Sequence, residues 1–485
     1  MKAATRNYLA LVASGVLITA ASPVAGAIDS VESAPPIEEN SELPESSFID
    51  EALKSSGPAE DSQEAASMAE EASKLPPLSS GLLGSGDHIG DQYTAFYHDP
   101  VDLDSSEPGQ LFRSESVRNP KNPLGISNVG PYKADRILYS STNRSGEKIQ
   151  VSGMVIEPKA EWGGEGPRPV VAFAPGTQGL ADRCAASRKI ADGVGDYEQF
   201  YFHQYLKKGY AVVLTDYEGL GTPGMHTYMD RASQGHTVLD SIRAAQQLDG
   251  WDINESNPVF INGYSQGGGA AAAAAELYDD YAPELNIKLA TIGAAPTDLT
   301  LLPSALDGSL YFLFEAYALL GLSNSYGEDL YSHLNDRGTR KLQDATNTCT
   351  MGLLKTADTT VERISNDGRN VQDFIDSEPF KSILAEQHIG YDAPAIPVVI
   401  THGRGDDVIP FSTAEKLVDE WTERGTDVTF IPNNAHTHPT GTIPHIIESV
   451  KAIDATLQHE KGSQLILALP LHHVKRLRGK QASKP

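Results

Sequence analysis

The sequence predicts an α/β fold in which a mostly parallel sheet carries helices on both faces and a helical cap is inserted late in the chain. Short apolar runs rich in β-branched residues alternate with helical patterns between residues 136 and 457. Such alternation is typical of a parallel sheet covered on both faces. The interval at about 298–395 breaks it, because it holds no convincing strand and includes the unusually apolar stretch 299–322. We interpret this interval as a cap over a binding site; a helical layer that only enlarges the core is the alternative.

The expected elements are bounded by glycine, proline and asparagine, which interrupt regular structure. Strands are expected at 136–141, 149–156, 170–174, 211–215, 258–262, 289–294, 398–401 and 428–431. Helices are expected at 197–208, 234–248, 269–278, 412–424 and 444–457.

The first part of the chain predicts export rather than a folded domain. Residues 1–27 combine basic residues, a short apolar stretch and a small-residue site ending at Ala27, as in a cleaved secretory signal peptide. The apolar stretch is short for a membrane anchor. Residues 28–86 are acidic and poor in aromatics, which predicts a disordered linker. The main domain is then expected at 87–460, followed by a basic C-terminal tail at 461–485.

Charge and cysteine content limit the partners. The formal net charge of −27 argues against nucleic acid, which would be repelled, and favours an uncharged substrate. The basic tail has two interpretations, a solvated terminus or contact with an anionic envelope component or lipid interface. The two cysteines, Cys184 and Cys349, suggest one disulfide in an exported protein, whereas a metal site would need more ligands at close spacing. The sequence does not indicate an oligomeric state.

The stretch 257–277 organises the predicted fold. It reads as a strand, a tight turn and an alanine-rich helix, with the pattern G-x-S-x-G at 263–267 in the turn. A serine at such a turn needs small neighbours and projects its hydroxyl above the sheet. A glycine-rich turn with an incidental serine is the alternative. The context favours Ser265 as a nucleophile, with the backbone amide of Gln266 available to a developing oxyanion.

A serine nucleophile needs a histidine base and an acid that orients it, which follow the serine in this order along the chain in folds with such an elbow. Asp406 and Asp407 follow the strand 398–401 and compete for the acid role. His436 and His438 follow the strand 428–431 and compete for the base. A second oxyanion donor is expected after the strand 170–174, from the amide of Thr177 or Gln178.

The chain from about residue 91 to 458 also resembles the secretory lipase family of α/β-hydrolases. The resemblance rests on PGTQGLADRCAAS (175–187), TDYEGLGTPG (215–224), GYSQGG and the helix after it (263–286), and GDDVIP (405–410). It implies the α/β-hydrolase fold, Asp406 as the acid and His438 as the base. It further implies a helical lid, a tunnel for an acyl chain, and a disulfide between Cys184 and Cys349.

The predicted function is a secreted serine ester hydrolase, a lipase that acts on lipid esters and needs neither a metal nor an organic cofactor. Acyl transfer to a sugar or alcohol of the envelope would use the same residues and is the alternative within enzymes. A peptidase is disfavoured because nothing marks a charged specificity pocket. Outside enzymes, the alternatives are a non-catalytic binding protein on a hydrolase scaffold and an envelope-associated interaction protein that works through its linker.

Overall fold

The computed structural model describes residues 94–117, 131–193, 196–459 and 475–477. The predicted signal peptide at 1–27, the linker at 28–86 and most of the basic tail at 461–485 therefore lie outside the described residues. None of the described helices combines the length and the apolar character that a membrane crossing requires.

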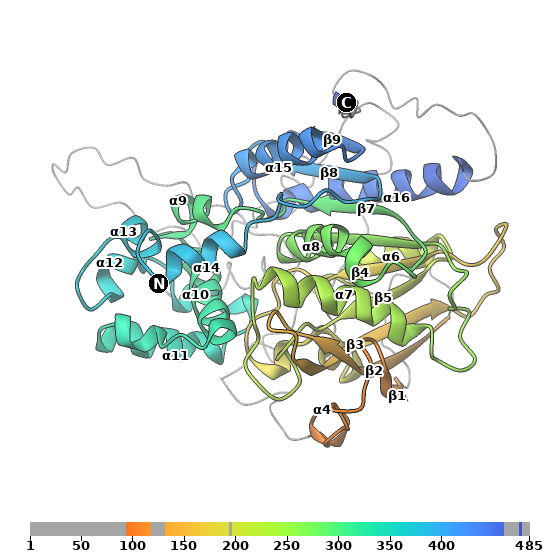
Figure 1. The fold of residues 1–485 in the computed structure, drawn as a ribbon, viewed down its shortest axis with the longest axis horizontal. Coiled ribbons are helices and arrows are strands. Elements are labelled where there is room, and N and C mark those ends of the chain that lie inside the picture. Colours follow the sequence, from red (N-terminus) through yellow and green to blue (C-terminus); the bar gives the residue numbers. More distant parts are fainter. Residues whose placement is uncertain (1–93, 118–130, 194–195, 460–474, 478–485) are drawn as a thin grey trace, which may run out of the picture.

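Within these residues, ten strands form one sheet in the order β1-β2-β3-β5-β4-β6-β7-β8-β9-β10 (Figure 1). Strands β5, β4, β6, β7, β8 and β9 are parallel neighbours, whereas the pairs β1–β2, β2–β3, β3–β5 and β9–β10 are antiparallel. The strands are β1 Leu111–Ser116, β2 Tyr132–Thr142, β3 Lys148–Pro158, β4 Val170–Ala174, β5 Ala211–Thr215, β6 Val259–Tyr264, β7 Ile287–Gly293, β8 Val398–Gly403, β9 Val428–Asn433 and β10 Lys475–Leu477. The predicted mostly parallel sheet is confirmed.

Every predicted strand overlaps an observed one, and the two additional strands lie at the edges of the sheet. Strand β1 is a partly exposed edge strand without a continuous apolar run, and β10 spans only three residues. Edge strands pair on one side only, so neither needs the apolar pattern that identifies a buried strand. Strands β2 and β3 extend beyond the predicted ranges because they pair with each other over their whole length. The pairing runs without a break from Tyr132 opposite Pro158 to Thr142 opposite Lys148.

Helices cover both faces of the sheet. The buried apolar residues of α7 (Arg231–Ala245), α8 (Gln266–Tyr281) and α15 (Phe411–Arg424) pack on one face. Those of α5 (Ala186–Ala191), α6 (Gln199–Lys207) and α16 (Thr442–His459) pack on the other. The short helix α4 (Ala95–His98) packs beside Leu138 of β2. Each face thus has its own apolar core, as expected for a sheet buried on both sides.

The interval between β7 and β8 forms a helical cap with a separate core, and it contains no strand in 298–395, all of which is described. Its helices are α9 Pro303–Leu306, α10 Phe312–Tyr326, α11 Asp336–Thr346, α12 Val361–Ile364, α13 Val371–Ile375 and α14 Phe380–Glu386. In Figure 1 these helices gather to one side of the sheet. The cap core also contains Leu180, Tyr228, Val408 and Ile409. Loops of the sheet domain therefore complete the core of the cap.

Candidate active site

Ser265 occupies a strained turn between β6 and α8. Its backbone angles are φ 61° and ψ −125°, a conformation that residues with a side chain rarely adopt. A Cβ at Gly263 would lie 2.0 Å from the carbonyl oxygen of Gly267, and a Cβ at Gly267 would lie 2.0 Å from that of Ala174. The Ser265 N–H donates to the Gly293 carbonyl at 3.0 Å. The flanking glycines thus allow the turn to close, and neighbouring strands hold it in place.

Asp406 and His438 meet at the carboxyl ends of β8 and β9. His438 Nδ1 lies 2.7 Å from Asp406 Oδ2, and the backbone N–H groups of Val408 and Ile409 donate to Asp406 Oδ1 at 3.0 and 2.8 Å. Burial raises the pKa of the Asp406 carboxyl, but the charge and hydrogen bond of His438 outweigh it, so that this pKa lies below its ordinary value. Asp406 is therefore an ionised acceptor that fixes the imidazole of His438.

The two competing residues on these loops have different surroundings. Asp407 Oδ1 accepts a hydrogen bond from the backbone N–H of His438 at 2.9 Å, and its Oδ2 accepts from Tyr311 Oη at 3.1 Å. Asp407 thus holds the main chain of His438 and links it to the cap. His436 is exposed, whereas His438 is buried and lines a cavity with Ser265.

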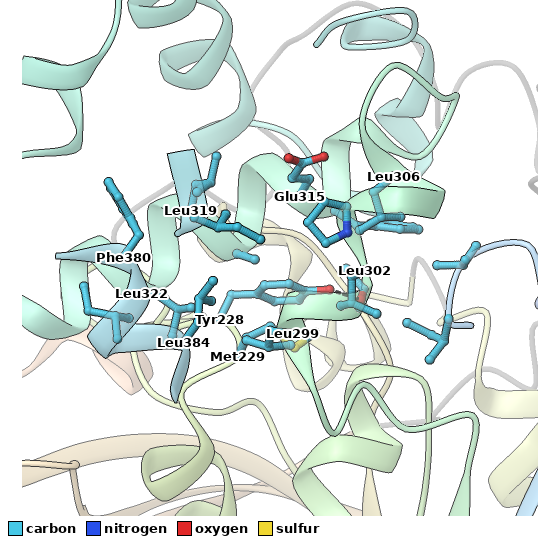
Figure 2. Close-up of a pocket in the computed structure, with 18 of the residues that line it drawn as sticks. Tyr228, Met229, Leu299, Leu302, Leu306, Glu315, Leu319, Leu322, Phe380 and Leu384 are labelled. Carbon is cyan, nitrogen blue, oxygen red and sulfur yellow. Dashed lines mark hydrogen bonds between the residues drawn. The ribbon is translucent and has the colours of Figure 1, made fainter. Parts of the chain in front are cut away.

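Two cavities meet at Ser265. The first lies under the cap, and its wall is almost entirely apolar (Figure 2). The second contains His438 and is richer in polar groups. Both are lined by Thr177, Ser265, Phe314 and Val408. The hydroxyl of Ser265 therefore stands where an extended molecule could occupy both cavities at once.

The loop after β4 lines the two cavities that meet at Ser265. Thr177 lines both cavities, and its hydroxyl lies 2.6 Å from Tyr228 Oη. The Thr177 carbonyl accepts from Tyr197 Oη at 3.1 Å and from the hydroxyl of Thr350. Gln178 lines neither cavity. Gln266 is the first residue of α8, where backbone N–H groups have no acceptor within the helix. The structure thus brings Thr177 and Gln266 to Ser265, with Gln178 behind them.

A buried glutamate that the sequence analysis did not identify supports this loop. Glu198 accepts from the backbone N–H of Gly176 at 2.9 and 3.0 Å and from Gln178 Nε2 at 2.9 Å. Burial, and next the charge of Asp196, raise the pKa of Glu198 well above its ordinary value. In the sequence Glu198 directly precedes a helix, a position where a carboxylate is usually solvated. Only its tertiary surroundings reveal its role.

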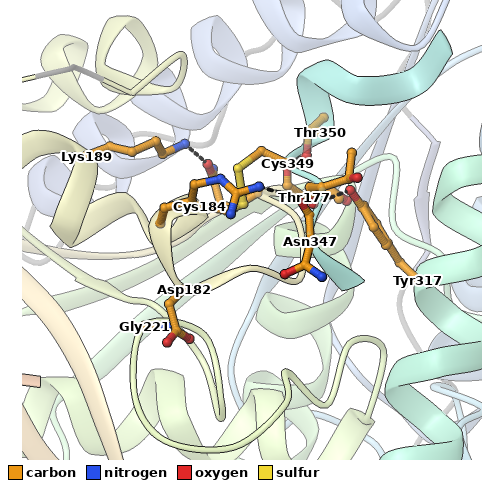
Figure 3. Close-up of a disulfide and its surroundings, with 12 residues drawn as sticks. Thr177, Asp182, Cys184, Lys189, Gly221, Tyr317, Asn347, Cys349 and Thr350 are labelled. Carbon is orange, nitrogen blue, oxygen red and sulfur yellow. Dashed lines mark hydrogen bonds between the residues drawn. A yellow bond between two sulfur atoms is a disulfide. The ribbon is translucent and has the colours of Figure 1, made fainter. Parts of the chain in front are cut away.

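The predicted disulfide is present and joins the cap to this loop. Cys184 and Cys349 are 165 residues apart and form an S–S bond (Figure 3). Beside the bond, the Leu180 N–H donates to the Thr348 carbonyl at 3.4 Å, and the Thr350 N–H donates to the Gln178 carbonyl at 3.0 Å. Covalent and backbone contacts therefore attach the start of η4 (Thr350–Lys355) to the segment around Gln178.

Comparisons with known proteins agree with this architecture. The sequence model of the secretory lipase family matches residues 189–462, more than half of the chain. A probable inactive lipase of Mycobacterium tuberculosis is 29% identical over 361 residues, covering 69% of this chain and 75% of that protein. A secreted triacylglycerol lipase of Malassezia globosa is 26% identical over 357 residues, covering 70% and 72%. The closed state of Candida antarctica lipase A superposes with a TM-score of 0.67 at 22% identity, covering 77% of this chain and 87% of that one.

Proposed function

The chain belongs to the secretory lipase family of ester hydrolases, and from that premise we propose that Ser265, His438 and Asp406 hydrolyse esters of lipids through an acyl-enzyme. The observation that carries the proposal is the contact of 2.7 Å between His438 Nδ1 and Asp406 Oδ2, in a wall of the cavity that Ser265 also lines. Because Nδ1 donates to the carboxylate, Nε2 is the nitrogen left free to accept a proton.

In the proposed reaction, Ser265 Oγ attacks the acyl carbonyl carbon while His438 Nε2 takes the hydroxyl proton. The bond between the carbonyl carbon and the alcohol oxygen then breaks, and His438 returns the proton to the departing alcohol. Water attacks the acyl-enzyme next, His438 takes one of its protons, and the free acid leaves as the proton returns to Ser265. Asp406 stays ionised throughout and stabilises the imidazolium that forms twice in each turnover.

The backbone amides of Gln266 and Thr177 are the proposed donors to the oxyanion. Helix α8 begins at Gln266, so its N-terminal dipole favours negative charge at this point. The Thr177 carbonyl is held by Tyr197 and Thr350, which restrains the loop before the reaction begins. Gln178 contributes by fixing this loop through Glu198. Preformed donors need no rearrangement as charge develops, which lowers the barrier.

The two cavities suggest which end of the ester lies where. The cavity under the cap fits an acyl chain, because its wall is almost entirely apolar and a hydrocarbon chain bound there is removed from water. The second cavity contains His438, which must reach the departing oxygen, so it fits the alcohol portion. The matching family is named secretory lipase and the Malassezia globosa relative is named a secreted lipase, and an extracellular location, with access to lipid esters outside the cell, is part of the proposal.

Replacement of Ser265 tests the proposal. Ser265→Ala should lower the turnover of p-nitrophenyl esters by several orders of magnitude, because it removes the hydroxyl that forms the acyl-enzyme in the proposed reaction. Ser304→Ala is the matched control, since Ser304 is an exposed serine on α9 of the cap. A fluorophosphonate probe should label the parent and the control but not Ser265→Ala. Labelling or turnover of Ser265→Ala at the parent rate would exclude Ser265 as the nucleophile.

A further inference from the structure

One carboxylic acid lies in the apolar wall of the cavity under the cap. Glu315 is on the first turns of α10, and only 6% of its surface is exposed. Among the described residues its Oε2 atom has no hydrogen-bond partner. Figure 2 shows the side chain among the leucines of the cavity wall. Buried polar atoms in folded proteins are nearly always paired, so the carboxyl of a cavity-lining residue with an unpaired oxygen has hydrogen-bonding capacity left for a bound molecule.

The other polar groups of this wall belong to the catalytic end of the cavity. Ser265 is the proposed nucleophile, and the hydroxyls of Thr177 and Tyr228 lie 2.6 Å apart and satisfy each other. The rest of the wall is formed by aliphatic and aromatic side chains and one methionine. Glu315 is therefore a single polar position in a surface otherwise suited to a hydrocarbon chain.

The surroundings of Glu315 favour its neutral form. Burial, and next the charge of Asp307, raise the pKa of the Glu315 carboxyl well above its ordinary value. The shift favours the protonated form of this carboxyl. A protonated carboxyl can donate one hydrogen bond and accept others. A hydroxyl group has the same two capabilities, whereas an alkyl chain has neither.

We propose that Glu315 binds a hydroxyl substituent on the acyl chain, so that esters of hydroxylated fatty acids are a preferred substrate class of this enzyme. The inference rests on the proposed function, because it takes the cavity under the cap as the acyl site. Glu315 is a specificity-determining residue in this assignment. A site that hydrogen-bonds a buried substituent discriminates against the analogue that lacks it, because the protein group is then left unpaired.

The test uses matched pairs of p-nitrophenyl esters, one with a plain fatty acyl chain and one with the same chain carrying a hydroxyl, over several lengths and hydroxyl positions. For each pair the measurement is the ratio of kcat/KM for the hydroxylated ester to that for the plain ester. At the best hydroxyl position, Glu315→Leu should lower this ratio about tenfold, as expected for loss of one buried hydrogen bond. Glu315→Gln keeps a donor and an acceptor and should retain most of the preference.

Leu319→Met is the matched control, because Leu319 lines the same cavity from the same helix and the change keeps an apolar side chain of similar volume. It should leave the ratio unchanged. A parent enzyme with no preference for any hydroxylated ester would overturn the proposal. A Glu315→Leu variant that loses activity on both members of each pair equally would also overturn it, since Glu315 would then only support the fold.

A binding measurement separates this inference from the proposed function. Ser265→Ala should bind hydroxylated fatty acids more tightly than plain ones, as measured by displacement of a fluorescent fatty-acid analogue, and Ser265→Ala/Glu315→Leu should lose that difference. If the parent hydrolyses no ester but the binding difference depends on Glu315, the proposed function fails and the Glu315 assignment stands. If the parent hydrolyses esters and no difference depends on Glu315, only the Glu315 assignment fails.

Discussion

The adjacent carboxylates Asp406 and Asp407 have separate tasks because their oxygens meet different donors. Asp406 is 1% exposed at its side chain and faces the ring of His438, so its charge acts directly on the imidazole. Asp407 accepts from the main chain of His438 and from the cap residue Tyr311. A one-residue difference in the loop thus decides which carboxylate contacts the imidazole of His438.

Replacement of each of the two histidines in the loop after β9 should have very different effects on enzyme activity. His438→Ala should lower kcat by several orders of magnitude, because of the two histidines it is His438 whose imidazole contacts Asp406. His436→Ala should stay close to the parent, because His436 is exposed. Steady-state kinetics on one p-nitrophenyl ester, with circular dichroism as the check on folding, measures both. The opposite ranking of the two variants would make His436 the base.

Residues in local motifs could be predicted from the sequence, whereas residues that act through tertiary burial could not. Ser265 is marked by its own neighbours, and the positions after strands leave two candidates each for the proposed acid and the proposed base. Spacing does not show which of two loop side chains points inward. Glu198 and Glu315 carry no local signal at all, because each becomes unusual only when distant segments bury it.

At the scale of elements, buried strands and one histidine hold the site to the sheet. His445 of α16 lies between two strands: its Nδ1 is 2.8 Å from Thr401 Oγ1 of β8, and its Nε2 is 3.1 Å from Asn262 Nδ2 of β6. The amide of Asn262 donates to Nε2, so Nδ1 carries the proton and donates to Thr401. Helix α16 is thereby attached to the strands that precede Ser265 and Asp406.

His445 should make the fold sensitive to mild acid. Burial lowers its pKa from 6.5 to about 3, so the folded state resists a proton that the unfolded state accepts. The stabilisation of the folded state that comes from the neutral His445 is complete above pH 6.5. As pH falls from there towards 3, the free energy of unfolding should drop by about 1.4 kcal/mol per pH unit from this group.

The variant His445→Asn should remove that contribution while keeping a polar group near Thr401. Urea unfolding at several pH values between about 4 and 7 should therefore give a shallower dependence on pH than the parent shows. His436→Asn serves as the control, because His436 is exposed and its replacement should leave the slope unchanged. An unaltered slope in His445→Asn would contradict a neutral, buried His445.

The elements that could be predicted are those with a strong local period. Central strands such as β4 and β5 match their predicted ranges because all five residues of each are buried. In the cap, α9 and α12 span four residues each. Helices of this length complete about one turn, which is too little to display a period of 3.6 residues. The cap could therefore be predicted as an interval, but the bounds of its helices could not.

At the scale of the whole molecule, the cap and the sheet domain share the site rather than enclose it separately. The cap core contains Tyr228 and Val408 from loops of the sheet domain, and the cap residue Tyr311 bonds to Asp407. The disulfide between Cys184 and Cys349 adds a covalent link beside the loop that carries Thr177. Movement of the cap would therefore be transmitted to the loops that hold His438 and Thr177, the proposed base and oxyanion donor.

The disulfide should matter more for stability than for turnover. It closes a loop of 165 residues, and such a link reduces the freedom of the unfolded chain, with a typical stabilisation of about 2–4 kcal/mol. The free energy of unfolding of the double variant Cys184→Ala/Cys349→Ala should be lower by that amount, which appears as a lower midpoint of urea unfolding. Its kcat/KM in buffer should stay close to the parent, because the bonds from Thr350 to Gln178 and Thr177 still position the loop.

Reductant provides the matched control for this prediction. Dithiothreitol should lower the unfolding midpoint of the parent to that of the double variant and leave the variant itself unaffected. Thiol titration of the unfolded, unreduced parent should find no free thiol, and two free thiols would exclude the bond. If the double variant instead lost activity in buffer while its unfolding midpoint was unchanged, the disulfide would act by positioning the loop at Thr177. The backbone bonds from η4 would then be too weak to hold that loop alone.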